Sequence, residues 1–274
     1  IADRSAESYP AIVNHVVYFG DGISRNTVFR GFNITGANHY VTRSENPIRI
    51  ERLPHNSPLK KKIFYYQDGG GVKIFGRSYP TIENVEMYNN YASPCAGGLS
   101  IEHQGFNQNS PLLQNCIFRH NTSQVTGSAV DVLPGSSATI DNCLFVNNIA
   151  NTGIDYIGQR SGHEFNKVHG SGALTVFPRS SVKVTRCTFT NNWNGVDDKG
   201  QASIYRDSIF WNNTAPGGIS EGQRYEIDIL DGNGVRGCWI HGDINDLHKT
   251  VDPKNNALDA PDPQFDDRYR PQGK

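Results

Sequence analysis

Residues 130–145 read VDVLPGSSATIDNCLF, and the same pattern recurs along the chain. VKIFGRSYPTIENVEM at 72–87 and LTVFPRSSVKVTRCTF at 174–189 superpose on it without a gap. Interrupted or weaker copies lie at 99–118, 204–213 and 235–243. Each copy alternates apolar and polar residues in short runs separated by Gly, Pro, Ser or Asn. This pattern predicts short strands with one face turned inward, and the repetition predicts a solenoid.

Aligned copies place similar residues in the same column. One column is small or apolar and contains Val85, Cys116, Cys143, Cys187, Ser208 and Cys238, and another contains Met87, Phe118, Phe145, Phe189, Phe210 and Ile240. A third contains Asn90, Asn121, Asn148, Asn192 and Asn213. Successive members of this Asn column are 31, 27, 44 and 21 residues apart, which is too variable for propeller blades but compatible with coils joined by loops. We predict stacked Phe rings, a hydrogen-bonded Asn ladder and packed, unpaired thiols.

The pattern x-Asn-Cys-x-Phe-x-x-Asn at 114–121 and 141–148 resembles right-handed parallel β-helix proteins of the pectin-lyase-like group. The resemblance covers roughly residues 25–243 and implies an all-β solenoid whose coils stack about 4.8 Å apart. We predict a single domain over 1–274, with an irregular cap at 1–24, an inserted loop within the coils at 25–243, and a C-terminal arm at 244–274. The group includes polysaccharide lyases, glycoside hydrolases, epimerases and adhesins, so the resemblance indicates fold more specifically than reaction.

Charge and hydropathy exclude two classes of partner. The chain of 274 residues has 26 Lys and Arg against 27 Asp and Glu, without the basic excess typical of nucleic-acid binding. No apolar run approaches the roughly 18 residues of a membrane span. We therefore expect a soluble monomer that binds neither nucleic acid nor the membrane interior. A polysaccharide partner, which the resemblance implies, would place it outside the cell or on the cell surface.

Catalytic groups are expected at outward strand positions, because inward positions are occupied by packing. The repeat places Lys73, Ser100, Asp131 and Thr175 in one outward column, to which GVDDKG at 195–200 adds Asp197 and Asp198. If 153–155 forms a further strand, Asp155 joins them. Several carboxylates on one face suit cleavage of a glycosidic bond, although outward charges also serve solubility. Asp155, Asp197 and Asp198 resemble the aspartates of β-helical polygalacturonases.

The other candidates lie in an insertion of roughly twenty residues between Asn148 and Leu174. Long loops in compact repeats are commonly functional, and this one is rich in acid–base groups. We predict catalytic roles for His163 and Lys167 beside Asp131, Asp155, Asp197 and Asp198. We predict substrate contacts for Tyr156, Arg160 and His169, together with Lys73 from the strand column.

Three functions remain open from the sequence. Hydrolysis of a polysaccharide is favoured because carboxylates outnumber cations on the expected face. β-Elimination from a uronate polymer is the first alternative, with a Lys or His base and a cation that neutralises the carboxyl group. Ca²⁺ is a possible cofactor through Asp228, Asp231, Asp243 and Asp246, although no metal ligand set is assigned. The second alternative is a non-catalytic binding or adhesin module, in which at least two of Trp193, Trp211 and Trp239 would face outward to stack on sugars.

Overall fold

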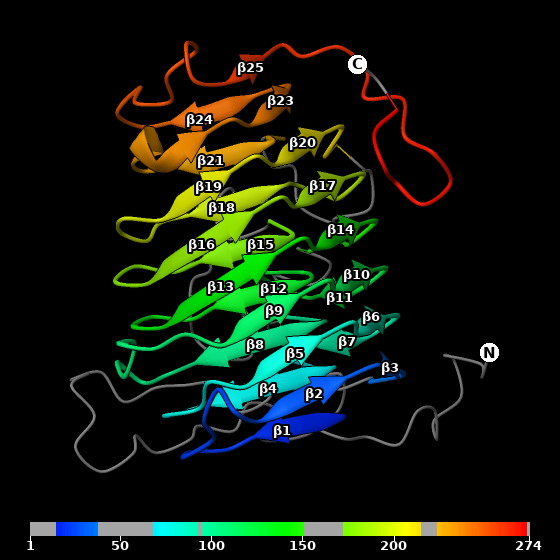
Figure 1. Ribbon diagram of the computed structural model, residues 1–274, viewed down its shortest axis with the longest axis vertical. Helices are drawn as coiled ribbons and strands as arrows, with labels where there is room; N and C mark the ends of the chain where they lie inside the picture. The colour runs from blue at the N-terminus through cyan, green and yellow to red at the C-terminus, as the bar shows by residue number, and fades with distance from the viewer. Residues whose placement is uncertain (1–14, 38–67, 93–94, 151–171, 215–223, 273–274) are drawn as a thin grey trace.

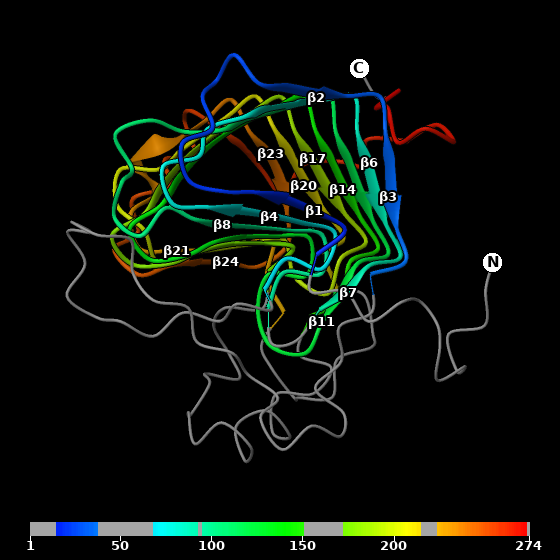
Figure 2. The same ribbon diagram turned by 90° about the horizontal axis from the view of Figure 1, so that it is seen from below.

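The computed structural model describes residues 15–37, 68–92, 95–150, 172–214 and 224–272. The chain winds through three parallel sheets, A, B and C, and a full coil adds one strand to each in that order. Figure 1 shows the coils stacked along the long axis, and Figure 2, seen along that axis, shows the sheets surrounding the core. The predicted all-β parallel β-helix is therefore confirmed.

The strands of the three sheets are short, as expected where corners interrupt every coil. Sheet A has the order β1 (Val17–Phe19), β4 (Val72–Phe75), β8 (Leu99–Glu102), β12 (Val130–Val132), β15 (Leu174–Val176), β18 (Val196–Asp198), β21 (Ile227–Ile229) and β24 (Ile244–Asp246). Sheet B has the order β2 (Val28–Arg30), β5 (Thr81–Glu83), β9 (Leu112–Gln114), β13 (Ser137–Asp141), β16 (Ser181–Thr185), β19 (Ile204–Arg206) and β22 (Val235–Arg236). Sheet C comprises β3 (Asn33–Thr35), β6 (Glu86–Tyr88), β10 (Ile117–Arg119), β14 (Leu144–Val146), β17 (Thr188–Thr190), β20 (Ile209–Trp211), β23 (Trp239–His241) and β25 (Ala257–Leu258). The remaining elements, outside these three sheets, are the short strands β7 (Tyr91–Ala92) and β11 (Thr122–Ser123) and a 3₁₀ turn, η1 (Gly232–Gly234).

The solenoid extends beyond both predicted boundaries. At its start, β1 pairs with β4, so a strand of the first coil lies within the stretch expected to be a cap. At its end, β24 pairs with β21 and β25 pairs with β23, so the stretch expected to be an arm still contributes strands. The sequence missed these strands because their coils lack the x-Asn-Cys-x-Phe motif from which the repeat was aligned.

The Phe column forms a continuous stack in the core. The centroids of Phe118, Phe145, Phe189 and Phe210 are 4.8, 4.3 and 5.0 Å apart in succession, and neighbouring ring planes differ by 11°, 7° and 11°. The in-register pairing of sheet C places each ring directly beside the equivalent ring of the next coil. Each ring is fully buried, which stabilises the fold by about 1.5–3 kcal/mol per side chain.

The Asn column forms the predicted ladder. The Nδ2 atoms of Asn90, Asn121, Asn148 and Asn192 each donate to the Oδ1 atom of the next Asn, at 3.1, 3.1, 2.9 and 2.8 Å. The ladder ends at Glu226, whose carboxylate accepts from the backbone N–H of Asn213 at 2.9 Å and from its Nδ2. Burial raises the pKa of Glu226 to about 7, although the bonds from Asn213 act in the opposite direction. The ladder therefore satisfies amide groups that would otherwise be buried without partners.

The cysteines are packed thiols, as the repeat predicted. Cys95, Cys116, Cys143, Cys187 and Cys238 are all buried and unpaired. The backbone N–H of Cys116 donates to Sγ of Cys143, and that of Cys143 donates to Sγ of Cys187, both at 3.4 Å. The residues before Cys116, Cys143, Cys187 and Cys238 turn the chain from sheet B to sheet C with a positive φ, for example 54° at Asn115 and 50° at Asn142. Asn tolerates this left-handed conformation better than most residues, which explains the Asn-Cys pair of the motif.

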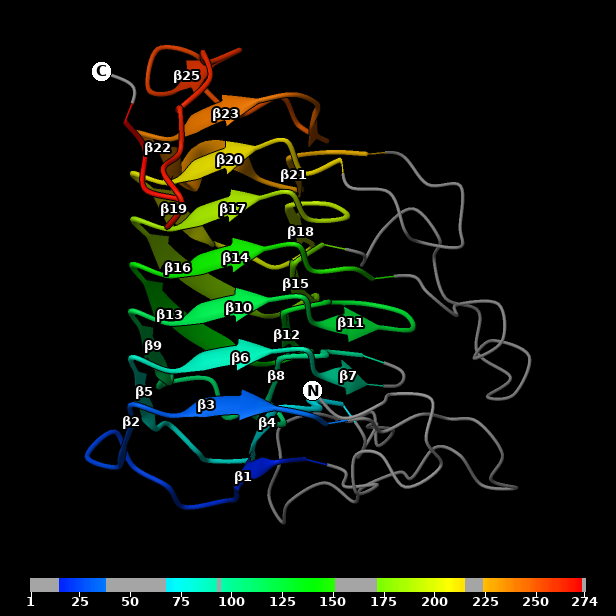
Figure 3. The same ribbon diagram turned by 90° about the vertical axis from the view of Figure 1, so that its right-hand side faces the viewer.

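The C-terminal arm packs along the solenoid. Residues 262–272 form a closed loop in which the N–H of Gln272 donates to the carbonyl of Pro263 at 2.9 Å. The Asp266 carboxylate organises this loop by accepting from the N–H groups of Arg268 and Arg270, each at 2.9 Å. Figure 1 shows the arm in red running back along the stack, and Figure 3 shows it beside β20.

Candidate functional site

The outward column of sheet A is polar along the stack, but it does not repeat a single residue as the inner columns do. Strand pairing places the following residues in one register: Tyr18, Lys73, Ser100, Asp131, Thr175, Asp197, Asp228 and Asn245. Their neighbours along each strand point inward and are mainly Val, Leu and Ile. The predicted alignment of Lys73, Ser100, Asp131 and Thr175 is therefore confirmed, and Asp197 shares it.

This column is buried although it faces away from the core. Lys73, Asp131 and Asp197 have no exposed surface, and Asp228 is 3% exposed. Outward strand charges in a solenoid are normally solvated, so their burial requires compensation by ion pairs, hydrogen bonds or protonation. Ion pairs and hydrogen bonds both occur here, and burial raises the pKa of Asp131.

Asp131 lies at the middle of the column in a setting that favours its protonated form. The Thr126 hydroxyl donates to Oδ2 of Asp131 at 2.9 Å, and Lys73 and the Cys95 thiol also favour the carboxylate. Burial outweighs these effects and raises the pKa of Asp131 to about 8. Gly127 has a φ of 52°, and a Cβ atom there would lie 1.7 Å from Oδ1 of Asp131. The carboxyl group thus requires glycine at the turn above it.

Lys73 is held by an ion pair on one side of Asp131. Its Nζ atom contacts the Glu102 carboxylate and lies 3.4 Å from the Ser100 hydroxyl. Gln104 donates to the other oxygen of Glu102 at 2.7 Å. Burial raises the pKa of Glu102, while Lys73 opposes this shift. The predicted substrate-binding role of Lys73 stays a prediction, and its charge is already compensated within the protein.

Asp197 lies on the other side of Asp131, next to a second lysine. The Tyr225 hydroxyl donates to Oδ2 of Asp197 at 3.1 Å, and the Nζ atom of Lys199 lies 3.6 Å from Oδ1. The same Nζ atom donates to Oδ1 of Asp228 at 2.5 Å. The phenol and the ammonium group both stabilise negative charge on Asp197. Asp131 and Asp197 are therefore two carboxyl groups in contrasting environments.

Asp198 does not join this face, which corrects the prediction that it would. Successive side chains of a strand point to opposite sides, so Asp198 points inward beside Asp197. The Tyr205 hydroxyl and the Gly200 N–H each donate to its carboxylate at 2.7 Å. Burial raises the pKa of Asp198, and these bonds oppose that shift. Asp198 thus compensates polar groups inside the solenoid instead of facing a substrate.

The candidates from the long insertion lie outside the described residues. They are Asp155, Tyr156, Arg160, His163, Lys167 and His169. Their assignment as catalytic or substrate-binding groups stays a prediction.

Sequence reasoning missed four residues that define the environment of the column: Glu102, Thr126, Lys199 and Tyr225. A signal existed for Glu102 and Lys199, because each lies two positions after a recognised outward residue and hence on the same side. Thr126 contacts Asp131 and Tyr225 contacts Asp197 because of the way the chain turns at the corners. The repeat contains no pattern that predicts these turns.

Three of the four acidic residues considered for Ca²⁺ have other roles. Asp228 binds Lys199, Asp231 caps η1, and Asp246 accepts from the N–H of Val251 at 2.6 Å. In the part of the chain that the structure describes, no group of three or more His, Cys, Asp or Glu side chains could hold a metal ion. The described residues also contain no helix with the length and hydropathy needed to cross a membrane.

The fold and the sequence together define a class of protein, the parallel β-helix. Residues 14–169 match a protein family described as "Right handed beta helix region". This match covers more than half of the chain, so the chain belongs to the right-handed β-helix family. Searches of curated proteins and of solved structures found no match.

Proposed function

We propose that the chain is a glycoside hydrolase that cleaves a polysaccharide bound along the outward face of sheet A. The proposal depends on one observation, the shared column of Asp131 and Asp197. The two residues lie two strands apart with Thr175 between them, which corresponds to roughly 9.5 Å at the usual spacing of strands. Inverting glycosidases separate their two carboxyl groups by about 6.5–9.5 Å to leave room for a water molecule.

The two environments support different roles for the two carboxyl groups. Asp131, with a pKa of about 8, keeps its proton at neutral pH and can donate it to the leaving oxygen. Asp197, beside the Lys199 ammonium group, can accept a proton from water on the opposite side of the sugar ring. The column is buried. A polymer can therefore reach these carboxyl groups only if the residues that cover the column move away from it. A polymer substrate also supports an extracellular or cell-surface location, which fractionation of the producing cells would test.

Substitution of each carboxyl group tests the proposal. Asp131→Asn and Asp197→Asn should each lower kcat by about 10²–10⁴-fold, the usual contribution of a positioned acid or base. Asp141→Asn is the matched control, because Asp141 lies on sheet B and pairs with Arg186. The substrates are a panel of neutral and uronate polysaccharides with and without EDTA, and the measurement is the release of reducing ends.

The product distinguishes the alternatives. Reducing ends without ultraviolet absorbance from an unsaturated sugar indicate hydrolysis. Absorbance that rises with the reducing ends indicates β-elimination from a uronate polymer. Binding without cleavage of any polymer would overturn the proposal in favour of a binding module.

A further inference from the structure

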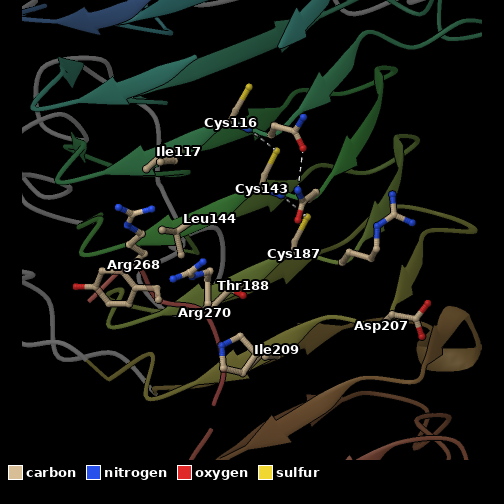
Figure 4. Close-up of a pocket in the computed structure, with 15 residues that line it drawn as sticks. Cys116, Ile117, Cys143, Leu144, Cys187, Thr188, Asp207, Ile209, Arg268 and Arg270 are labelled. Carbon is tan, nitrogen blue, oxygen red and sulfur yellow. Dashed lines mark hydrogen bonds between the residues drawn. The ribbon is translucent and has the colours of Figure 1, made fainter. Parts of the chain in front are cut away.

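A hollow lies far from the outward column of sheet A, between the C-terminal arm and the corner that joins sheets B and C. Its volume is about 400 Å³, within the roughly 300–1,000 Å³ typical of small-molecule pockets. The arm contributes Arg268, Tyr269, Arg270 and Pro271. The solenoid contributes residues of sheet C and of the corner that precedes it, from several successive coils. Figure 4 shows the thiols of Cys116, Cys143 and Cys187 one below the other at this corner.

The floor of the hollow is partly apolar and continues onto an aromatic surface. Equivalent outward positions of sheet C are occupied in succession by Ile117, Leu144, Thr188, Ile209 and Trp239. The indole N–H of Trp239 donates to the carbonyl of Pro261 at 3.0 Å, which fixes the start of the arm beside this surface. Trp211, also on the outward face, packs on His241 with ring centroids 4.5 Å apart. Trp211 and Trp239 thus face outward as predicted, whereas Trp193 is buried.

The charges of the hollow are separated. Figure 4 shows Arg268 beside Ile117 and Leu144, with Arg270 near Thr188 and Asp207 at the far end. Arg270 is partly compensated by Asp266, with an Nε–Oδ2 distance of 2.8 Å. The Arg268 guanidinium forms no hydrogen bond or ion pair with any of the described residues in the structure. An exposed cation beside the adjacent apolar side chains of Ile117 and Leu144 favours a ligand that has both a carboxylate and an apolar ring face.

We propose that this hollow binds an acidic oligosaccharide, with a sugar ring packed on the adjacent side chains of Ile117 and Leu144 and its carboxylate bound by Arg268. The exposed amides of Asn115 and Asn142, which line the hollow, are available to sugar hydroxyls. This site is separate from the outward column of sheet A and does not depend on cleavage there. Its function is to hold a uronate-containing polymer at a second point, which raises the effective concentration of the polymer at the protein.

Calorimetric titration of the whole chain tests the site. The probes are trimers of galacturonate, guluronate and glucuronate, each compared with its methyl ester, which lacks the charge. At least one acid should bind, and its ester should bind at least about tenfold more weakly, because a charge-assisted bond is lost. Arg268→Ala should weaken binding of the acid by a similar factor and Arg268→Glu by more.

A control variant locates the binding. Arg206→Ala removes an exposed arginine from the outward face of sheet B and should bind the acid as the unaltered chain does. Absence of binding by all three acids at millimolar concentration would overturn the inference. Equal binding of acid and ester, unchanged binding by Arg268→Glu, or an equal loss of binding in Arg206→Ala would also overturn it. Hydrolysis assays are read separately, so failure of this site and failure of the proposed activity are distinguishable.

Discussion

The inner columns of the solenoid and the outward column of sheet A follow opposite rules. Inside, the same residue recurs from coil to coil, as in the stack from Phe118 to Phe210. Outside, the residue type changes from Lys73 to Ser100, Asp131 and Thr175, and Asp then recurs at 197 and 228. Stacking of identical groups maximises packing and mutual hydrogen bonding, whereas an acid, a base and binding groups need different side chains or different environments. Departure from the repeat at buried polar positions is therefore the mark of a candidate site.

The largest expected effect is on the inner Phe column. Phe145→Ala should destabilise the protein by about 3–5 kcal/mol, because it removes a fully buried ring that stacks on both neighbours. Ile117→Ala, at an outward position that is 37% exposed, should cost less than about 1 kcal/mol. Unfolding in denaturant measures both. Equal losses would show that the inner column has no special role in stability.

The Asn ladder should show a smaller effect of the same kind. Asn148→Ala removes the donor to the carbonyl of Phe118 and the acceptor of two bonds from Asn121, and should cost about 2–3 kcal/mol. Asn142→Gly is the control, because Asn142 donates to Asn115 in an exposed pair and glycine accepts its positive φ. Its cost should stay below about 1 kcal/mol, and a larger cost than that of Asn148→Ala would contradict the distinction between buried and exposed amides.

The outward column should be visible in the pH dependence of stability. Because the pKa of Asp131 is about 8 in the folded state and near 3.8 when unfolded, the folded state binds more protons between these values. The contribution of Asp131 to the free energy of unfolding is therefore fully present at low pH. It falls by about 1.4 kcal/mol per pH unit as the pH rises toward 8.

Asp131→Asn should remove this dependence of the free energy of unfolding on pH. The difference between the variant and the unaltered chain separates the contribution of Asp131 from those of other groups. His103, whose pKa burial lowers to about 4, acts in the opposite direction and is present in both proteins. Unfolding in denaturant at several pH values between 5 and 8 provides the measurement. Parallel curves for the two proteins would show that Asp131 is ionised when folded, which removes the argument for its role as an acid.

The sequence determined the coil, the columns and the direction in which strand residues point. Identical residues at equivalent positions specify stacking, and period-two alternation specifies inside and outside; this was sufficient to align Asp131 with Asp197. The same alternation, applied strictly, excludes Asp198, which was grouped with Asp197 because adjacent acids resembled a catalytic pair.

Only the tertiary structure decided which charges are buried and what compensates them. The pairing of Lys73 with Glu102, the contact of Tyr225 with Asp197 and the protonation of Asp131 depend on how corners close over sheet A. The hollow beneath Arg268 likewise depends on the arm folding back over coils distant in sequence. A repeat specifies interactions between equivalent positions, whereas these contacts join positions that are not equivalent. The cost of burying these charged side chains, and the shift in their pKa, arise only in the folded chain.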